Sequence, residues 1–178
     1  ENNGSEAFLK NISDSIGLLA LQGPAAIKIL KELTDADLDA IENYHFIDDQ
    51  EVAGIPHVLI SRTGYTGEDD FELYLAGEKT ALLWEKLLAA GEAYGVLPCG
   101  LGSRDTLRLE AGMPLYGHEL SEEINPLAAG LGFAVKTKKA SDFIGKAALT
   151  AIQGNGPTEK IIGFEATERG IPREGYKV

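Results

Sequence analysis

Apolar residues in the first part of the chain recur at two spacings, one typical of strands and one of helices. Residues 16–21 form a short apolar run that predicts a buried strand. Residues 25–33 carry apolar side chains at helical spacing, and Pro24 stands at the start, where its missing N–H costs nothing. A weaker helical pattern covers residues 38–44. We therefore expect a strand followed by two helices.

The clearest hairpin lies further along. Residues 57–62 predict a strand, residues 63–69 a Gly-rich turn, and residues 70–76 the returning strand. Apolar and polar side chains alternate in the returning strand, so one face is expected to join the core and Glu72 to lie on the other. The core face is formed by Phe71, Leu73 and Leu75.

The remaining pattern predicts shorter elements separated by turns. We expect helices at residues 79–94, 103–110 and 145–152, and strands at residues 131–135, 160–166 and 176–178. The Gly- and Pro-rich residues 153–157 indicate a linker, which predicts domains at residues 1–156 and 157–178. Strands and helices mix without regular βαβ spacing, and the predicted fold class is therefore α+β.

The composition is that of a globular protein and narrows the possible functions. Of 178 residues, 44% are hydrophobic and 25% charged. The net charge of −12, from 16 Lys and Arg against 28 Asp and Glu, argues against a nucleic-acid partner. No apolar run reaches the roughly 18 residues of a membrane span. We therefore expect small molecules or other proteins as partners, with no nucleic acid and no membrane.

Metal and disulfide chemistry are not expected either. The single cysteine, Cys99, excludes a disulfide framework and a multi-cysteine metal site, and we expect it to be buried as a small apolar residue. The three histidines are scattered and lack metal-ligand spacing.

Residues 61–72 are the first candidate for ligand binding. Gly64 and Gly67 bracket Tyr65 and allow the turn to approach a ligand closely. A fixed carboxylate at Glu72 could accept two parallel N–H bonds from a planar edge such as that of a 2-amino-4-oxo-pterin. The alternative is a solvent-facing strand residue beside a tight acidic turn.

Residues 100–110 are the second candidate. Arg104 lies at the start of the predicted helix, where its guanidinium and the backbone N–H groups could hold an anion. The alternative is a surface ion-pair network that includes Arg108 and its acidic neighbours. Local chemistry alone indicates no more than a ligand-binding domain.

Seven segments, in this order, resemble the aminomethyltransferases (T-proteins) of the glycine cleavage system. They are residues 19–24, 61–69, 100–110, 114–117, 125–127, 142–146 and 169–173. Any one of them could arise by chance, but the ordered set is specific and extends over essentially the whole chain.

The resemblance implies a transferase of one-carbon metabolism and glycine catabolism, with tetrahydrofolate as co-substrate and no metal. Such enzymes take an aminomethyl group from the lipoyl arm of a carrier protein (the H-protein), pass the one-carbon unit to tetrahydrofolate and release ammonia. The resemblance further implies a folate-binding domain with a ferredoxin-like α/β subdomain, followed by the start of a C-terminal β-barrel. In the family, the glutamate matching Glu72 holds the pterin edge, and Arg104 and Tyr65 match residues of the folate site.

The chain also departs from the family. The family's catalytic aspartate lies in an N-terminal region that has no counterpart here, so no catalytic residue is assigned and the chain alone is expected to be inactive. The polar residues 1–6 and the strand-like residues 176–178 suggest a piece of a longer protein. Asp70 stands where the family usually has glycine. If that glycine has a positive φ, aspartate is among the more tolerable replacements.

Several alternatives stay open on the sequence. The chain could be the folate-binding domain of a sarcosine or dimethylglycine dehydrogenase-like protein, a non-catalytic paralogue, or a domain that only docks a partner. A bacterial cytoplasmic location is expected, with a mitochondrial one as the alternative. A basic cluster could meet an acidic carrier protein or could simply be a solvated face; it consists of Lys136, Lys138, Lys139 and Lys146.

Overall fold

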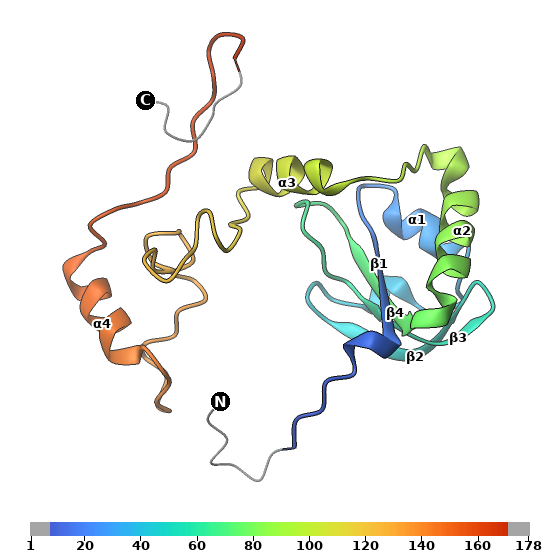
Figure 1. Cartoon of the computed structure of the whole chain (residues 1–178), viewed down its shortest axis with the longest axis horizontal. Helices are drawn as coiled ribbons and strands as arrows, with labels where there is room; N and C mark the ends of the chain where they lie inside the picture. Colours follow the sequence, from blue (N-terminus) through green and yellow to red (C-terminus); the bar gives the residue numbers. More distant parts are fainter. Residues whose placement is uncertain (1–7, 171–178) are drawn as a thin grey trace. The chain divides into compact units, whose positions relative to one another are not determined.

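The structure is a computed structural model that describes residues 8–170 of the chain (Figure 1). The chain divides into two compact units, one ending at Met113 and the other beginning at Pro114. The domain boundary expected near residue 156 falls inside the second unit and stays a prediction.

The first unit is built on one antiparallel sheet with the strand order β1-β4-β3-β2. The strands are β1 (Ile16–Leu21), β2 (Phe46–Val52), β3 (Ile55–Ser61) and β4 (Phe71–Ala76). The predicted strand at residues 16–21 and the predicted hairpin are confirmed as β1, β3 and β4. β1 pairs with β4 in a continuous register, in which Ala20 lies opposite Glu72. This pairing brings the turn after β1 beside the loop that precedes β4.

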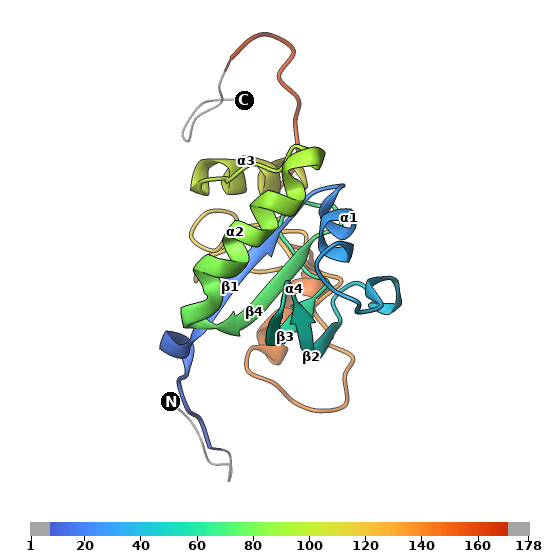
Figure 2. The ribbon, with the colours of Figure 1, turned by 90° about the vertical axis from the view of Figure 1, so that its right-hand side faces the viewer.

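Two helices cover one face of this sheet (Figure 2). α1 (Ala26–Lys31) follows β1, and α2 (Thr80–Gly91) follows β4. α2 continues into a 3-10 turn and ends at Gly95, whose φ of 75° is left-handed. The helix predicted at residues 38–44 is wrong, because only a 3-10 turn forms there (Leu38–Ala40), begun by the Asp37 carboxylate accepting from Ala40 N. Two further 3-10 turns span Ser13–Ser15 and Gly77–Lys79.

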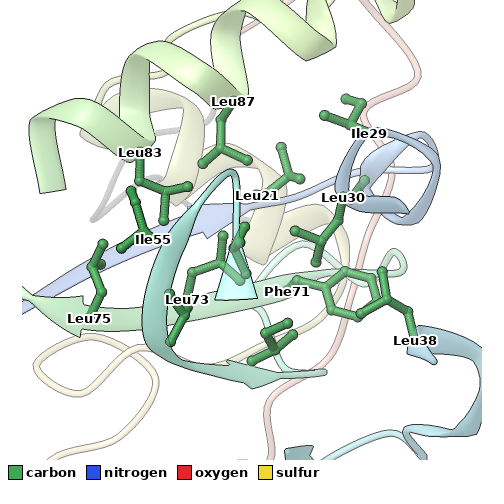
Figure 3. Close-up of a cluster of buried hydrophobic side chains, with 14 of the residues drawn as sticks. Leu21, Ile29, Leu30, Leu38, Ile55, Phe71, Leu73, Leu75, Leu83 and Leu87 are labelled. Carbon is green, nitrogen blue, oxygen red and sulfur yellow. The ribbon is translucent and has the colours of Figure 1, made fainter. Parts of the chain in front are cut away.

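The core lies between the helices and the sheet (Figure 3). Phe71, Leu73 and Leu75 are at most 2% exposed and pack against Leu83 of α2 and Leu30 of α1. The alternation predicted for β4 is therefore confirmed. Its polar positions lie on the opposite face of the sheet, where no helix of the first unit packs.

β2 was not predicted, and its sequence explains why. Its residues 48–51 are all polar, because β2 is an edge strand and much of it faces solvent. Its pairing with β3 is also irregular, with Gln50 opposite Val58 and register shifts on both sides. A strand with this composition and these bulges carries no clear period-2 signal.

The α+β class is correct, but the element order differs from a ferredoxin-like unit. A βαββαβ unit places a helix between its last two strands. Here residues 62–70 join β3 directly to β4, and α2 follows β4. Because β3 and β4 are antiparallel, they need no crossover helix between them, and a short loop is enough to connect them.

The last helix of the first unit is α3 (Leu101–Glu110), which confirms the helix predicted at residues 103–110. It begins after Gly100, whose extended backbone ends the preceding loop.

The second unit contains one described helix, α4 (Lys146–Asn155), where a helix was predicted. The strand predicted at residues 131–135 is wrong: Ala134 N donates to Leu131 O and Val135 N to Gly132 O, so these residues form a turn. Residues 160–166 form no strand, and Ile161 N donates only to Ala128 O. Residues 176–178 lie outside the described residues. No strand of a C-terminal barrel is thus present among residues 114–170, because a short apolar run needs a pairing partner to form one.

Removing a core side chain tests this packing. We expect Leu73→Ala to lower the free energy of unfolding by about 2–5 kcal/mol, because the residue is fully buried. Leu18→Ala is the matched control, since Leu18 is 46% exposed, and should cost less than about 1 kcal/mol. Urea unfolding followed by the fluorescence of Trp84, the single tryptophan, reports on the first unit. Equal losses in the two variants would contradict the assigned faces.

Candidate ligand-binding site

A buried carboxylate anchors the loop between β3 and β4. Asp70 is 4% exposed, and its Oδ1 accepts from Gly23 N at 2.8 Å. Oδ2 lies 3.2 Å from Thr66 N and 2.7 Å from the Thr66 hydroxyl. Asp70 does not have a positive φ, so an aspartate at this position carries no strain from a left-handed backbone. The carboxylate therefore joins the turn after β1 to the loop.

Gly64 and Gln22 complete this anchor. A Cβ at Gly64 would lie 2.1 Å from Asp70 Cβ, so the loop needs glycine there for close approach. Gln22 Oε1 accepts from Tyr65 N at 3.0 Å. The backbone that carries Tyr65 is thus held from two sides.

Arg62 supports the base of the loop, and each nitrogen of its guanidinium donates a hydrogen bond. Its guanidinium pairs with Asp69 through two bonds, Nε to Oδ1 at 2.8 Å and Nη2 to Oδ2 at 3.0 Å. Nη1 donates to Ile41 O at 2.9 Å. The hydrogen bond to Asp69 raises the pKa of Arg62 above its ordinary value. We therefore assign Arg62 to loop structure rather than to ligand binding.

Glu72 lies on the sheet face opposite the core, as predicted, and is half-buried. Its Oε2 accepts from the Thr63 hydroxyl at 2.5 Å and from the Tyr74 hydroxyl at 3.3 Å. No group in residues 8–170 donates to Oε1. Glu72 is therefore a positioned carboxylate with one open oxygen, and a freely solvated strand residue does not fit this geometry.

Tyr74 shares the environment of Glu72. Burial raises the pKa of the Tyr74 hydroxyl, and the negative charge of Glu72 and the hydrogen bond to it raise that pKa further. The phenol is therefore held in its neutral, donating form well above neutral pH.

Arg104 and Tyr65 are brought together. Arg104 lies in the first turn of α3, and its guanidinium carbon is 4.8 Å from the centroid of the Tyr65 ring. Arg104 forms no ion pair with any described residue. Of the alternative surface ion-pair network, the described residues form one pair, in which Arg108, which is buried, lies 2.7 Å from Asp105. Arg104 is thus exposed and available to an anion.

Arg104 also borders an apolar groove of about 760 Å³ in the first unit. The apolar wall comes from β1, α2 and α3 together with the loop before α3, and includes Leu18, Leu21, Trp84, Leu87, Leu97, Leu101 and Leu107. Gln22, Thr66 and Ser103 add polar groups. Neither Glu72 nor Tyr65 lines this groove. Two of the three predicted residues thus meet each other, while Glu72 stands apart on the sheet.

Some residues around the site were not predicted. The alternation in β4 already placed Tyr74 on the face of Glu72, but nothing in the sequence showed the bond from Thr63 or the anchoring role of Asp70. Cys99 borders the groove and is exposed, so the expectation that it is buried was wrong.

Within residues 8–170, no three or more His, Cys, Asp or Glu side chains come together as a metal site. None of the helices in that part of the chain has the length and apolar character needed to cross a membrane.

The chain is similar to proteins of known family. The GCVT N-terminal domain model matches residues 1–139. Aminomethyltransferase of Bacillus subtilis (strain 168) is 52% identical over 178 residues, which are 100% of this chain and 49% of that protein. Aminomethyltransferase of Symbiobacterium thermophilum is 56% identical over 167 residues, 93% of this chain and 44% of that protein. The chain thus spans about half the length of the curated relatives it matches.

A solved structure is similar as well. The crystal structure of glycine cleavage system aminomethyltransferase T from Bartonella henselae matches with a TM-score of 0.67 and 35% identity. The match covers 80% of this chain and 38% of that one.

Loss of the loop anchor should be costly. We expect Asp70→Ala to lower the free energy of unfolding by about 2–3 kcal/mol, because two partly buried backbone N–H groups lose their charged acceptor. Glu68→Ala, at an exposed neighbouring position, should change it by less than about 0.5 kcal/mol. Urea titration monitored by Trp84 fluorescence gives both values. An Asp70→Ala chain as stable as the parent would show that the carboxylate is not an anchor.

The coupling between Tyr74 and Glu72 is measurable by titration. We expect Glu72→Gln to lower the pKa of Tyr74, because the phenolate no longer faces a negative charge, while burial still keeps it above its ordinary value. NMR of ¹³C-labelled tyrosine rings follows this pKa. Tyr94, whose pKa is raised by its hydrogen bond to Glu32, serves as the reference that should not move. An unchanged Tyr74 pKa would argue against the contact.

Proposed function

The chain belongs to the GCVT N-terminal domain family, and from this premise we propose that it is the folate-binding part of a glycine-cleavage aminomethyltransferase. The complete enzyme would take the aminomethyl group carried by a lipoylated carrier protein, the H-protein. It would pass the one-carbon unit to tetrahydrofolate as co-substrate and release ammonia. Support comes from relatives named aminomethyltransferase that are 52% and 56% identical over nearly all of this chain.

Glu72 carries the folate assignment. Its carboxylate is held by hydroxyl groups on Oε2 and leaves Oε1 open on a sheet face that no helix of the first unit covers. The pterin of tetrahydrofolate presents an amino group and a ring N–H side by side. Two parallel N–H donors of this kind match a carboxylate, and the charged acceptor makes these bonds strong. We assign the pterin edge to Glu72.

Arg104 and Tyr65 would hold another part of the folate. The Arg104 guanidinium stacks on the Tyr65 ring and has no carboxylate partner in the described part of the chain. Folates end in a glutamate whose carboxylates are anions, and a guanidinium binds carboxylates through two parallel bonds. We assign this end, or another polar group of the folate, to Arg104, with Tyr65 as the aromatic wall.

No residue of this chain is assigned to the chemical step. We propose that the chain alone is inactive, because the family's catalytic aspartate has no counterpart in it. The alternative of a sarcosine or dimethylglycine dehydrogenase-like domain is less well supported, since the similar curated proteins reported above are aminomethyltransferases. Their bacterial sources favour a cytoplasmic protein over a mitochondrial one.

The basic cluster remains the candidate contact for an acidic carrier protein. Lys136 Nζ donates to Phe133 O and Lys146 Nζ to Lys139 O, so these two lysines partly serve the local backbone. Lys138 and Lys139 are exposed and form no ion pair within residues 8–170. They are the members of the cluster that a partner could reach most easily.

Calorimetric titration of this chain with tetrahydrofolate tests the proposal. We expect saturable binding that Glu72→Gln weakens by about 1.5–3 kcal/mol, because bonds to a charged acceptor are lost. Arg104→Ala should weaken it by about 1 kcal/mol, since Arg104 is exposed.

Glu78→Gln is the matched control for the Glu72 variant, because Glu78 is exposed and lies outside the site. It should leave the affinity unchanged. A folded chain that shows no saturable binding would contradict the assignment of the pterin site to this chain. Equal effects of the two glutamate variants would remove Glu72 from it.

A further inference from the structure

We infer that Thr63 is the positioning residue for Glu72, and that Tyr74 is a second donor which a ligand displaces. The inference rests on the proposed role of Glu72 in pterin binding. It adds to that role a division of labour between the two hydroxyl groups that contact the carboxylate. Thr63 sets the direction of the carboxylate, and Tyr74 occupies a place that a two-donor ligand needs.

The two hydroxyl contacts differ in strength. The Thr63 hydroxyl lies 2.5 Å from Glu72 Oε2, at the short end of the range for an O–H donor and a charged oxygen. The Tyr74 hydroxyl is 3.3 Å from the same oxygen, beyond the usual range for O–H···O bonds. Thr63 therefore provides the firm attachment and Tyr74 a weak one.

Thr63 is itself held in place. It lies two residues after Ser61, and the two hydroxyl groups are 3.0 Å apart. Ser61 is 9% exposed and lies opposite Glu72 in the pairing of β3 with β4. The three side chains thus form a short chain of hydrogen bonds across adjacent strands, in which each bond strengthens the next. Packing of the sheet fixes Ser61, the residue at the far end of this series of hydrogen bonds.

The number of hydrogen bonds that a carboxylate oxygen can accept explains why the bond from Tyr74 must break when a ligand binds. A carboxylate oxygen has two lone-pair sites, and on Oε2 these face Thr63 and Tyr74. A ligand edge with two parallel N–H groups needs one site on each oxygen. Oε1 is open, but on Oε2 one hydroxyl has to yield, and the longer bond yields at lower cost. The structure thus favours planar edges with two donors strong enough to replace a phenol.

The test compares substitutions at both hydroxyl groups in the 178-residue chain, by calorimetric titration with tetrahydrofolate. We expect Thr63→Val to weaken affinity about 10-fold and Thr63→Ser to restore it to within about twofold of the parent, since serine keeps the hydroxyl. Tyr74→Phe should leave the affinity unchanged or raise it up to about threefold. Thr150→Val, at an exposed position in α4, is the control and should have no effect.

A double-mutant cycle separates positioning from general loss of structure. If Thr63 acts through Glu72, Thr63→Val should change affinity by less than about twofold when Glu72 is already Gln. Thr63→Ala provides the same test should valine fail to fold, with melting temperatures as the check on folding. An equal effect in both backgrounds would overturn the positioning role, and a Tyr74→Phe variant that binds about 10-fold more weakly would overturn displacement.

The outcomes also separate this inference from the proposed function. Absence of tetrahydrofolate binding by the folded parent chain overturns both. Binding that Glu72→Gln weakens and Thr63→Val leaves unchanged overturns only the role of Thr63.

Discussion

The buried carboxylate of Asp70 is the interaction on which the arrangement of the first unit's candidate site depends. It accepts from Gly23 N and from both donors of Thr66, and so ties the turn after β1 to the loop between β3 and β4. A buried carboxylate is stable only when its oxygens accept hydrogen bonds, and here two backbone N–H groups and the Thr66 hydroxyl donate them. Substitution of Asp70 by any residue without a carboxylate or similar acceptor at this place would remove the anchor.

Both parts of the proposed folate site follow from this anchor. On one side, the loop presents the Tyr65 ring to Arg104 of α3. On the other side, Thr63, the second residue of the loop, donates its hydroxyl to Glu72 near the start of β4. One loop therefore organises a cation held against an aromatic ring and a carboxylate with one open oxygen. Both groups have the charge or hydrogen-bonding capacity that a folate needs.

Sequence periodicity predicted the regular elements well where burial was one-sided. β4 alternates because one face packs on α2 and the other does not, and Leu73 and Glu72 were assigned to opposite faces from the sequence alone. It failed where this condition did not hold. β2 is a bulged edge strand with mostly polar residues, whereas residues 131–135 are apolar but pair with no strand of the described residues 8–170.

The sequence by itself determined the residue types at the candidate site, the α+β class and the resemblance to a family. Local patterns reach that far because hydrophobic alternation and motif order lie within short stretches of chain. Only the tertiary structure decided that Arg104 meets Tyr65 and that Thr63 holds Glu72. These contacts depend on strand register and loop anchoring, which bring together residues distant in sequence, and no periodicity in the sequence encodes those distances.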